Sequence, residues 1–294
     1  MPDQPAAEVT RVEVGGRLLR LTSLSKVMYP ETETTKGEVL DYYARVAPLL
    51  LPHIARRPVT RVRWPHGVAQ DRFFEKNLPP GAPPWLPSVR VEDVTYPLVE
   101  DLAQLTYLVN LNSLELHVPQ WTVTKQGVRE NPNRLVIDLD PGPPAGLHEC
   151  CRVALLVRER LEALGLTLHP VTSGSKGMQL YASLGGDLTS EQVRDLAAQL
   201  AQELTRQHPD IVVWKMTRSL RPGKVFLDWS QNVAAKTTIA PYSLRGRDLP
   251  TVATPVTWDE VGHGADSASG LTHFQLTEVL ERVEALGDLL ADIP

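Results

Sequence analysis

Two aspartates separated by one residue lie at the end of an apolar run in the segment RLVIDLDPG. Alternate residues of a strand point to the same face, so Asp138 and Asp140 are expected on one side, with Ile137 and Leu139 packed on the other. Carboxylates this close repel each other unless a cation lies between them. A pair of divalent metal ions meets that need in phosphoryl transfer, and oxygen ligands favour Mg²⁺ or Mn²⁺. Two solvated acids at the end of a surface strand are the alternative.

A third aspartate ends another apolar run. In KVFLDWSQN, Asp228 follows Val225, Phe226 and Leu227. An acid at the end of a hydrophobic strand usually has a partner. Asp228 is therefore predicted as a third metal ligand, and a capping or turn-forming aspartate is the alternative.

Candidates for phosphate binding lie close to these acids in the sequence. The segment VTSGSKGMQLY places Ser173, Lys176 and Gly177 in a turn with small side chains, free backbone N–H groups and one cation, which can cradle phosphate oxygens. Its spacing is not that of a Walker A loop. Arg221 precedes Asp228 and Arg245 follows it, and such cations suit a triphosphate. A solvated basic face is the alternative.

The elements that must position these residues alternate between helix and strand. Thr35 and Glu38 have capping-box spacing at the start of a helix that runs to about Leu51. Three more helices are expected over Glu149–Leu164, Ser190–Gln207 and about Thr272–Leu290, and strands over residues 59–64, 135–140, 168–172, 178–184, 211–216 and 224–230. The Pro-rich stretch 77–87 is predicted as a surface loop. The pattern indicates an α/β (α+β) fold with mixed sheets flanked by helices.

The composition suits a globular protein. The chain has 294 residues, 42% of them hydrophobic, and a net charge of −5, which disfavours nucleic-acid binding unless the cations cluster. Cations do gather near the candidate site, in RPVTRVRW, TRSLRPGKV and SLRGR. No apolar run reaches the roughly 20 residues of a membrane helix, and the first residues have no signal-peptide pattern. The adjacent Cys150 and Cys151 are expected as small apolar residues on a helix, in a reducing cytoplasm.

Taken in order, the motifs resemble the polymerase domain of bacterial ligase D, the end-joining branch of the archaeo-eukaryotic primase superfamily. The resemblance runs from about Lys26 to Leu290, and it rests on SLSKVMYP, TTKGEVLDYY, RVRWPHG, RFFEKNLP, LELHVPQW, RLVIDLDPG, VTSGSKG, SLRPGKVFLDWSQN and KTTIAPYSLRGR. It implies a primase-polymerase core over residues 21–294, after an N-terminal extension over 1–20. It also implies a bacterial enzyme, associated with the nucleoid, that extends the 3′-OH of DNA ends or gaps in double-strand break repair and favours ribonucleotides.

The same resemblance assigns roles to individual residues. Asp138, Asp140 and Asp228 match ligands of two Mn²⁺ or Mg²⁺ ions, the first two bridging both ions and Asp228 on the 3′-OH side. The nucleotide-binding positions are His117, Ser173, Lys176, Gly177, Gln179, Arg221 and Arg245. The DNA-binding positions are Lys26 and Lys36 for a 5′-phosphate at a gap or recessed end, Arg63, and Phe73 and Phe74 for the template strand. Core packing is the alternative for the two phenylalanines. The implied partners are NTP or dNTP, 5′-phosphorylated DNA, Ku and a DNA ligase.

One position departs from the family pattern. The family usually has a histidine two residues after the last glycine of SGSKG, and this chain has Gln179. Glutamine can donate a hydrogen bond but carries no charge near neutral pH, so nucleotide affinity or rate is expected to differ. Two other functions stay open: a catalytically weak module that binds DNA ends, and an aspartate-dependent phosphohydrolase. Pro141 and Gly142 after the second aspartate disfavour the phosphohydrolase, in which a threonine commonly follows.

Overall fold

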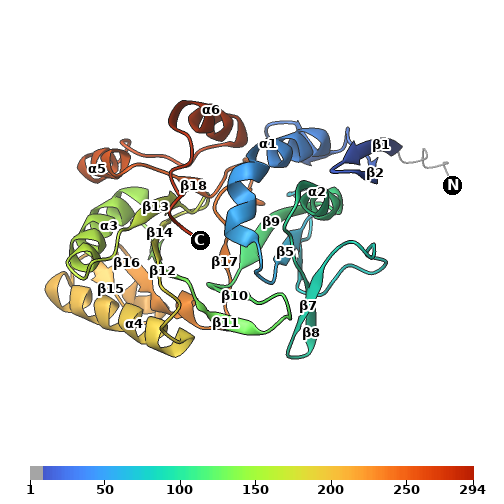
Figure 1. The fold of residues 1–294 in the computed structure, drawn as a ribbon. Helices are drawn as coiled ribbons and strands as arrows, with labels where there is room; N and C mark the ends of the chain where they lie inside the picture. Colours follow the sequence, from blue (N-terminus) through green and yellow to red (C-terminus); the bar gives the residue numbers. More distant parts are fainter. Residues whose placement is uncertain (1–8) are drawn as a thin grey trace.

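Two β-sheets organise the chain, as Figure 1 shows for the computed structural model, which describes residues 9–294. The larger sheet has the strand order β15-β16-β12-β14-β13-β18, and the smaller has the order β17-β9-β5-β6. The strands of the larger sheet are β12 (Arg134–Pro141), β13 (His169–Thr172), β14 (Met178–Ser183), β15 (Val212–Val213), β16 (Val225–Asp228) and β18 (Thr254–Pro255). Those of the smaller sheet are β5 (Thr60–Arg63), β6 (Phe73–Glu75), β9 (Ser113–Val118) and β17 (Thr238–Ile239).

Four two-stranded ribbons surround these sheets. They are β1 (Val9–Val14) with β2 (Arg17–Thr22), β3 (Val27–Tyr29) with β4 (Thr34–Thr35), β7 (Ser88–Val91) with β8 (Val94–Pro97), and β10 (Trp121–Val123) with β11 (Arg129–Pro132). The predicted boundary at residue 20 falls inside β2, where Leu19 and Leu21 are buried in the core. The division into an extension over 1–20 and a domain over 21–294 stays a prediction, and residues 1–8 lie outside the described residues.

Helices cover both sheets. They are α1 (Lys36–Ile54), α2 (Leu102–Asn110), α3 (Leu147–Glu162), α4 (Ser190–Gln207), α5 (Trp258–Asp266) and α6 (Leu276–Leu286). The predicted capping boxes at Thr35 and Thr189 are present, because each threonine oxygen accepts from the backbone three residues on. The last helix ends earlier than predicted, where Gly287 adopts a φ of 69°. No helix in the described residues is long and apolar enough to cross a membrane.

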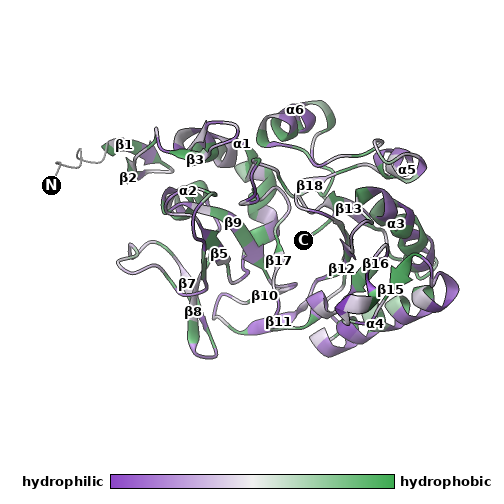
Figure 2. Cartoon of the chain, turned by 180° about the vertical axis from the view of Figure 1, so that it is seen from behind, coloured by the Kyte–Doolittle hydropathy of each residue, from purple (hydrophilic) through white to green (hydrophobic). Residues whose placement is uncertain are grey.

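Two hydrophobic cores follow this division. The first packs α1 and α2 against the smaller sheet, and the second packs α3, α4 and α5 against the larger sheet. Figure 1 shows α3, α4 and α5 on the left and α1 and α2 at the centre and right, and Figure 2 shows hydrophilic residues on α3 and α4. Cys150 and Cys151 are free thiols buried in α3, as predicted. The mixed α/β fold with helices flanking the sheets is confirmed.

Candidate functional site

Strand pairing brings the predicted acids together. Asp138 on β12 lies directly opposite Asp228 on β16, in antiparallel register. On its other side, Asp138 lies opposite Gln179 on β14. Asp140 follows two residues later on the same face of β12, and the carboxylates of Asp138 and Asp140 line one cavity. The central strand therefore presents its acids between two neighbouring strands.

The carboxyl group of Asp138 is in an unfavourable place for a negative charge. Burial and the nearby charge of Asp228 raise its pKa to about 7, although a hydrogen bond from Gln179 Nε2, at 3.3 Å, opposes the shift. Burial also raises the pKa of Asp140, while the cations Arg221 and Lys176 oppose that rise. A cation between these carboxylates would remove their mutual repulsion, so the donor set fits a divalent metal ion bound by oxygen.

The acids also have partners in the protein. Asp140 Oδ2 accepts from Arg221 Nη1 at 3.3 Å, and Asp228 Oδ1 accepts from the Ser230 backbone at 3.1 Å. Lys236 Nζ lies 3.8 Å from Asp228 Oδ2. Within residues 9–294, no three His, Cys, Asp or Glu side chains are grouped closely enough to hold a metal ion.

A cavity of about 360 Å³ lies beside these acids, between the two sheets. Eight of the predicted nucleotide-site or metal-site residues line it, namely His117, Asp138, Asp140, Ser173, Lys176, Gly177, Gln179 and Arg245. Arg247 adds another cation from the segment that follows Arg245. Arg221 adjoins this set through Asp140, and Asp228 does so through its pairing with Asp138.

The turn from Ser173 to Gly177 differs from the prediction of free backbone donors. Ser173 Oγ accepts from the backbone N–H groups of Ser175, Lys176 and Gly177, at 3.2, 3.3 and 3.1 Å. The serine oxygen thus occupies the place predicted for a phosphate oxygen, and its hydroxyl proton can point outward. A Cβ on Gly177 would lie 1.9 Å from the carbonyl oxygen of Leu139, so only glycine allows this turn to approach β12 so closely.

Gln179 has a fixed orientation. Its side chain is buried, and Tyr181 Oη donates to Gln179 Oε1 at 3.0 Å. The amide nitrogen therefore faces Asp138. Gln179 therefore presents a neutral donor to the carboxylate.

A buried carboxylate that the sequence analysis missed connects the cavity residues. Glu115 Oε2 lies 2.8 Å from His117 Nε2, and Glu115 Oε1 accepts from the Gly246 backbone at 3.0 Å and lies 3.5 Å from Arg245 Nε. Burial alone would raise the pKa of Glu115, but the hydrogen bond from His117 and the charge of Arg245 outweigh it and lower the pKa to about 2. The spacing of Glu115 and His117, two residues apart in LELHVPQW, is the sequence signal for this contact.

The two lysines predicted to grip a 5′-phosphate lie outside the cavity, near each other. Lys36 is 2% exposed, and its Nζ donates to the Thr22 carbonyl at 2.7 Å. Lys26 Nζ donates to the Pro65 carbonyl at 2.9 Å and to Asn112 Oδ1. Burial and the charge of Lys26 lower the pKa of Lys36 to about 8. Neither ammonium has an acidic partner among the described residues.

The remaining predicted DNA-binding residues lie on β5 and β6. Phe73 and Phe74 are 50% and 59% exposed, so core packing, the alternative for this pair, is wrong. The Phe74 ring lies edge-on to His117, with 6.5 Å between ring centroids. Arg63 Nε donates to the Leu111 carbonyl at 2.6 Å, and its Nη1 donates to Glu75 Oε1 at 2.6 Å. The phenylalanines therefore form an exposed aromatic edge next to the cavity.

The acids are paired across neighbouring strands, and a cavity with several cations lies beside them between the two sheets. This arrangement defines the class of protein as a metal-dependent nucleotidyltransferase of the primase-polymerase type. The family model described as the LigD primase-polymerase domain matches residues 35–290. The chain belongs to this family, which confirms the resemblance predicted from the motifs.

Relatives and solved structures agree with this assignment. The chain is 49% identical over 279 residues to the multifunctional non-homologous end joining protein LigD of Mycolicibacterium smegmatis, covering 94% of this chain and 36% of that protein. It is 33% identical to the bifunctional LigD of Bacillus subtilis, covering 92% of this chain and 43% of that protein. The polymerase domain from Mycobacterium tuberculosis ligase D, solved in complex with DNA, matches with a TM-score of 0.89 and 46% identity, covering 94% of this chain and 99% of that one. The chain thus spans only a part of the length of these curated relatives.

Proposed function

We propose that this chain is a template-directed polymerase that adds nucleotides to the 3′-OH of DNA ends or gaps during double-strand break repair. The observation that carries the proposal is the pairing of Asp138 with Asp228 beside a cavity lined by Lys176 and Arg245. The mycobacterial relatives, named as end-joining proteins, and the similar domain solved with DNA support it. A preference for ribonucleotides is part of the proposal, as is action in the cytoplasm at the nucleoid.

In this proposal Asp138, Asp140 and Asp228 hold two Mn²⁺ or Mg²⁺ ions. Such ions, when bound, lower the pKa of the attacking 3′-OH and neutralise charge on the triphosphate. The protein itself contributes the position of the carboxylates, which strand pairing fixes on β12 and β16. Arg221 then exchanges its contact with Asp140 for one with the incoming nucleotide.

The other cavity residues bind the triphosphate. Lys176, Arg245 and Arg247 supply positive charge. Ser173 can donate its hydroxyl proton to a phosphate oxygen, because its oxygen already accepts three backbone N–H groups. His117 presents its other ring nitrogen, Nδ1, because Nε2 is bound to Glu115.

The DNA is proposed to contact the surface formed by β5, β6 and the N-terminal lysines. Phe73 and Phe74 are exposed at the edge of the smaller sheet, where they can stack on template bases. A 5′-phosphate would relieve the repulsion between Lys26 and Lys36. Burial and, after it, the charge of the nearby Arg63 lower the pKa of the Lys26 ammonium, so Arg63 belongs to the same positive surface. Ku and a DNA ligase are the proposed protein partners.

Primer extension on a 5′-phosphorylated gapped duplex, with Mn²⁺ and each nucleotide type, tests the proposal. Asp138→Ala and Asp140→Ala are expected to reduce extension by a factor of about 1,000 or more, since each removes a transition-state interaction. Asp259→Ala, which removes an exposed aspartate from α5, is the control and should extend normally. Near-normal extension by Asp138→Ala would sink the assignment. Binding of the gapped duplex without extension by the unaltered protein would favour the end-binding module instead.

A further inference from the structure

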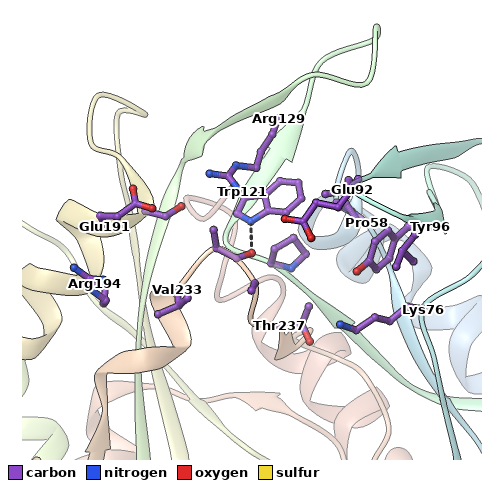
Figure 3. Close-up of a pocket in the computed structure, with 16 residues that line it drawn as sticks. Pro58, Lys76, Glu92, Tyr96, Trp121, Arg129, Glu191, Arg194, Val233 and Thr237 are labelled. Carbon is purple, nitrogen blue, oxygen red and sulfur yellow. Dashed lines mark hydrogen bonds between the residues drawn. The ribbon is translucent and has the colours of Figure 1, made fainter.

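A second cavity, of about 290 Å³, opens beside the nucleotide cavity (Figure 3). Several separate segments form its walls: the β7–β8 hairpin, β10 and β11, the start of α4, and the loop from Val233 to Thr237. Its lining includes Tyr96, Trp121, Arg129, Lys76, Arg194 and Thr237. Except for Thr237, none of these six residues lines the nucleotide cavity.

The two cavities are neighbours, because Thr237 lines both of them. The residues that follow pair with β9, with Thr238 opposite Val118 and Ile239 opposite His117. On the other side of the loop, Trp121 Nε1 donates to the Ala234 carbonyl at 2.8 Å, drawn as a dashed line in Figure 3. The segment that contains Thr237 is therefore held at both ends, and a strand of DNA that passes Thr237 would meet both cavities.

The second cavity has an apolar floor. Trp121 is only 5% exposed, and together with Val89 and Val123 it forms a small hydrophobic core of its own. Tyr96 packs against this core and is partly exposed, and its hydroxyl has no hydrogen-bond partner among the described residues. Val91 adds a further apolar side chain. A flat, partly polar ring suits such a surface.

Cations surround this floor. The Arg129 guanidinium lies over the Trp121 ring, 5.5 Å from its centroid. Lys76 is exposed and makes no hydrogen bond or ion pair within the described part of the chain, and Arg194 extends from α4. Arg194 is paired with Asp195, and two acids, Glu92 and Glu191, also line the cavity, so Lys76 and Arg129 are the lining cations that have no ion pair in the described residues. Aromatic floors edged with Arg and Lys bind single-stranded nucleic acid, because bases stack and phosphates pair with the cations.

We propose that this second cavity binds an unpaired nucleotide of the DNA strand that continues past the nucleotide cavity. The inference rests on the proposed polymerase function, because that function brings DNA to Thr237. The base packs on Tyr96 and the floor beside Trp121, and its phosphate lies against Arg129 and Lys76. The site therefore recognises a single-stranded extension at a break, without reading its sequence.

Fluorescence anisotropy of labelled DNA tests this site. A 5′-phosphorylated duplex with a short unpaired 3′ tail of thymidines is compared with its blunt counterpart. The unaltered chain is expected to bind the tailed duplex about tenfold more tightly. Arg129→Ala and Tyr96→Leu should each remove most of that preference and leave blunt-duplex binding within about twofold. Arg158→Ala is the matched control, because Arg158 also lies over a tryptophan ring, that of Trp258, away from both cavities.

Equal affinity of the unaltered chain for the two duplexes would overturn the proposal. So would a full preference for the tail in both variants. Arg129 is exposed, so its variant is expected to fold, and thermal melting verifies that for both. Single-nucleotide gap filling separates this inference from the proposed function. If the unaltered chain fills gaps but both variants keep the preference for the tail, the cavity proposal is refuted and the polymerase function stands. If the unaltered chain fills no gap, the proposed polymerase function is refuted, whatever its affinity for the tailed duplex.

Discussion

Replacing Glu115 with Gln removes one negative charge from beneath the nucleotide cavity and changes the side-chain volume little. The carboxylate contacts His117, Gly246 and Arg245, which belong to two segments of the cavity wall. Burial lowers the pKa of Arg245, and the negative charge of Glu115 opposes that shift. Glu115 is therefore a positioning residue, which acts on the nucleotide through His117 and Arg245.

The size of the effect follows from the contacts. A hydrogen bond to a charged group contributes about 1.5–3 kcal/mol and a neutral one about 0.5–1.5 kcal/mol, so each contact weakens by about 1 kcal/mol. Two of the contacts orient groups that face the nucleotide, and 1.4 kcal/mol corresponds to a factor of ten, so KM for the nucleotide is expected to rise roughly 5- to 30-fold. The metal-ligand aspartates are untouched, so kcat should stay within about threefold.

Steady-state nucleotide incorporation on a gapped duplex measures both constants. Glu260→Gln is the matched control, because Glu260 also accepts from a backbone N–H and pairs with an arginine, Arg282, but lies on α5. It should lower the melting temperature without changing KM. The reasoning is refuted if Glu115→Gln leaves KM within twofold, or if kcat falls while KM stays constant.

Three further predictions concern charge in the interior. Asp138→Asn should raise the melting temperature of the metal-free protein at pH 8 by roughly 5 °C. The pKa of Asp138 is raised in the folded protein, so the folded state loses stability as the pH rises from 3.8 towards 7 and this carboxyl ionises, and asparagine does not ionise. Mn²⁺ should then stabilise the unaltered protein more than this variant. Burial and the charges of Arg134 and Arg57 lower the pKa of the buried His53 to about 3. Below pH 6.5 the unfolded state therefore binds more protons than the folded state, and the free energy of unfolding should fall by up to about 5 kcal/mol as the pH is lowered towards 3. His53→Leu should not show this loss, because it removes the imidazole. Gln179→His should lower KM for the nucleotide several-fold, about 1 kcal/mol, because an imidazole can add positive charge beside the triphosphate.

Each of these has an outcome that contradicts it. Equal melting temperatures for Asp138→Asn and the unaltered protein at pH 8 would mean that the carboxylate is not strained by its neighbours. The free energy of unfolding in urea can be measured from pH 7 to pH 4 for His53→Leu and for the unaltered protein. An equal fall in the two proteins would exclude His53 as a source of acid sensitivity. An unchanged or higher KM for Gln179→His would mean that the amide already suits the nucleotide.

The sequence predicted best the features that depend on local pattern. The capping boxes at Thr35 and Thr189 placed the starts of α1 and α4 correctly, and the alternation around Asp138 predicted its shared face with Asp140. Long apolar strands such as β12 and β14 were also found. These features are determined within a few residues of the chain.

Features that depend on distant partners were harder to predict. Strand β9 alternates polar and apolar residues in SLELHV, but its polar side chains are largely buried by distant partners, and both the strand and the network around Glu115 were missed. The run 211–216 forms only the two-residue β15, because its remainder turns towards η1 (Arg218–Leu220). Helix α5 was missed because its two glycines, Gly262 and Gly264, disfavour a helix. Gly264 is nevertheless required by packing, because a Cβ at this position would lie only 2.6 Å from Cys151 Sγ. Tertiary packing overrides propensity in these places.

Three tyrosines near the start of the chain are bonded to the segment that carries Arg245. Tyr29 Oη donates to the Arg245 carbonyl and Tyr42 Oη to the Tyr242 carbonyl, across 216 and 200 residues of sequence, and Tyr43 Oη accepts from the Leu244 backbone. Such long-range contacts form late in folding, because loop-closure entropy must first be overcome. During synthesis the nucleotide cavity therefore stays incomplete until almost the whole domain has left the ribosome. Nascent fragments, even those that already contain all three aspartates, should be unable to bind nucleotide.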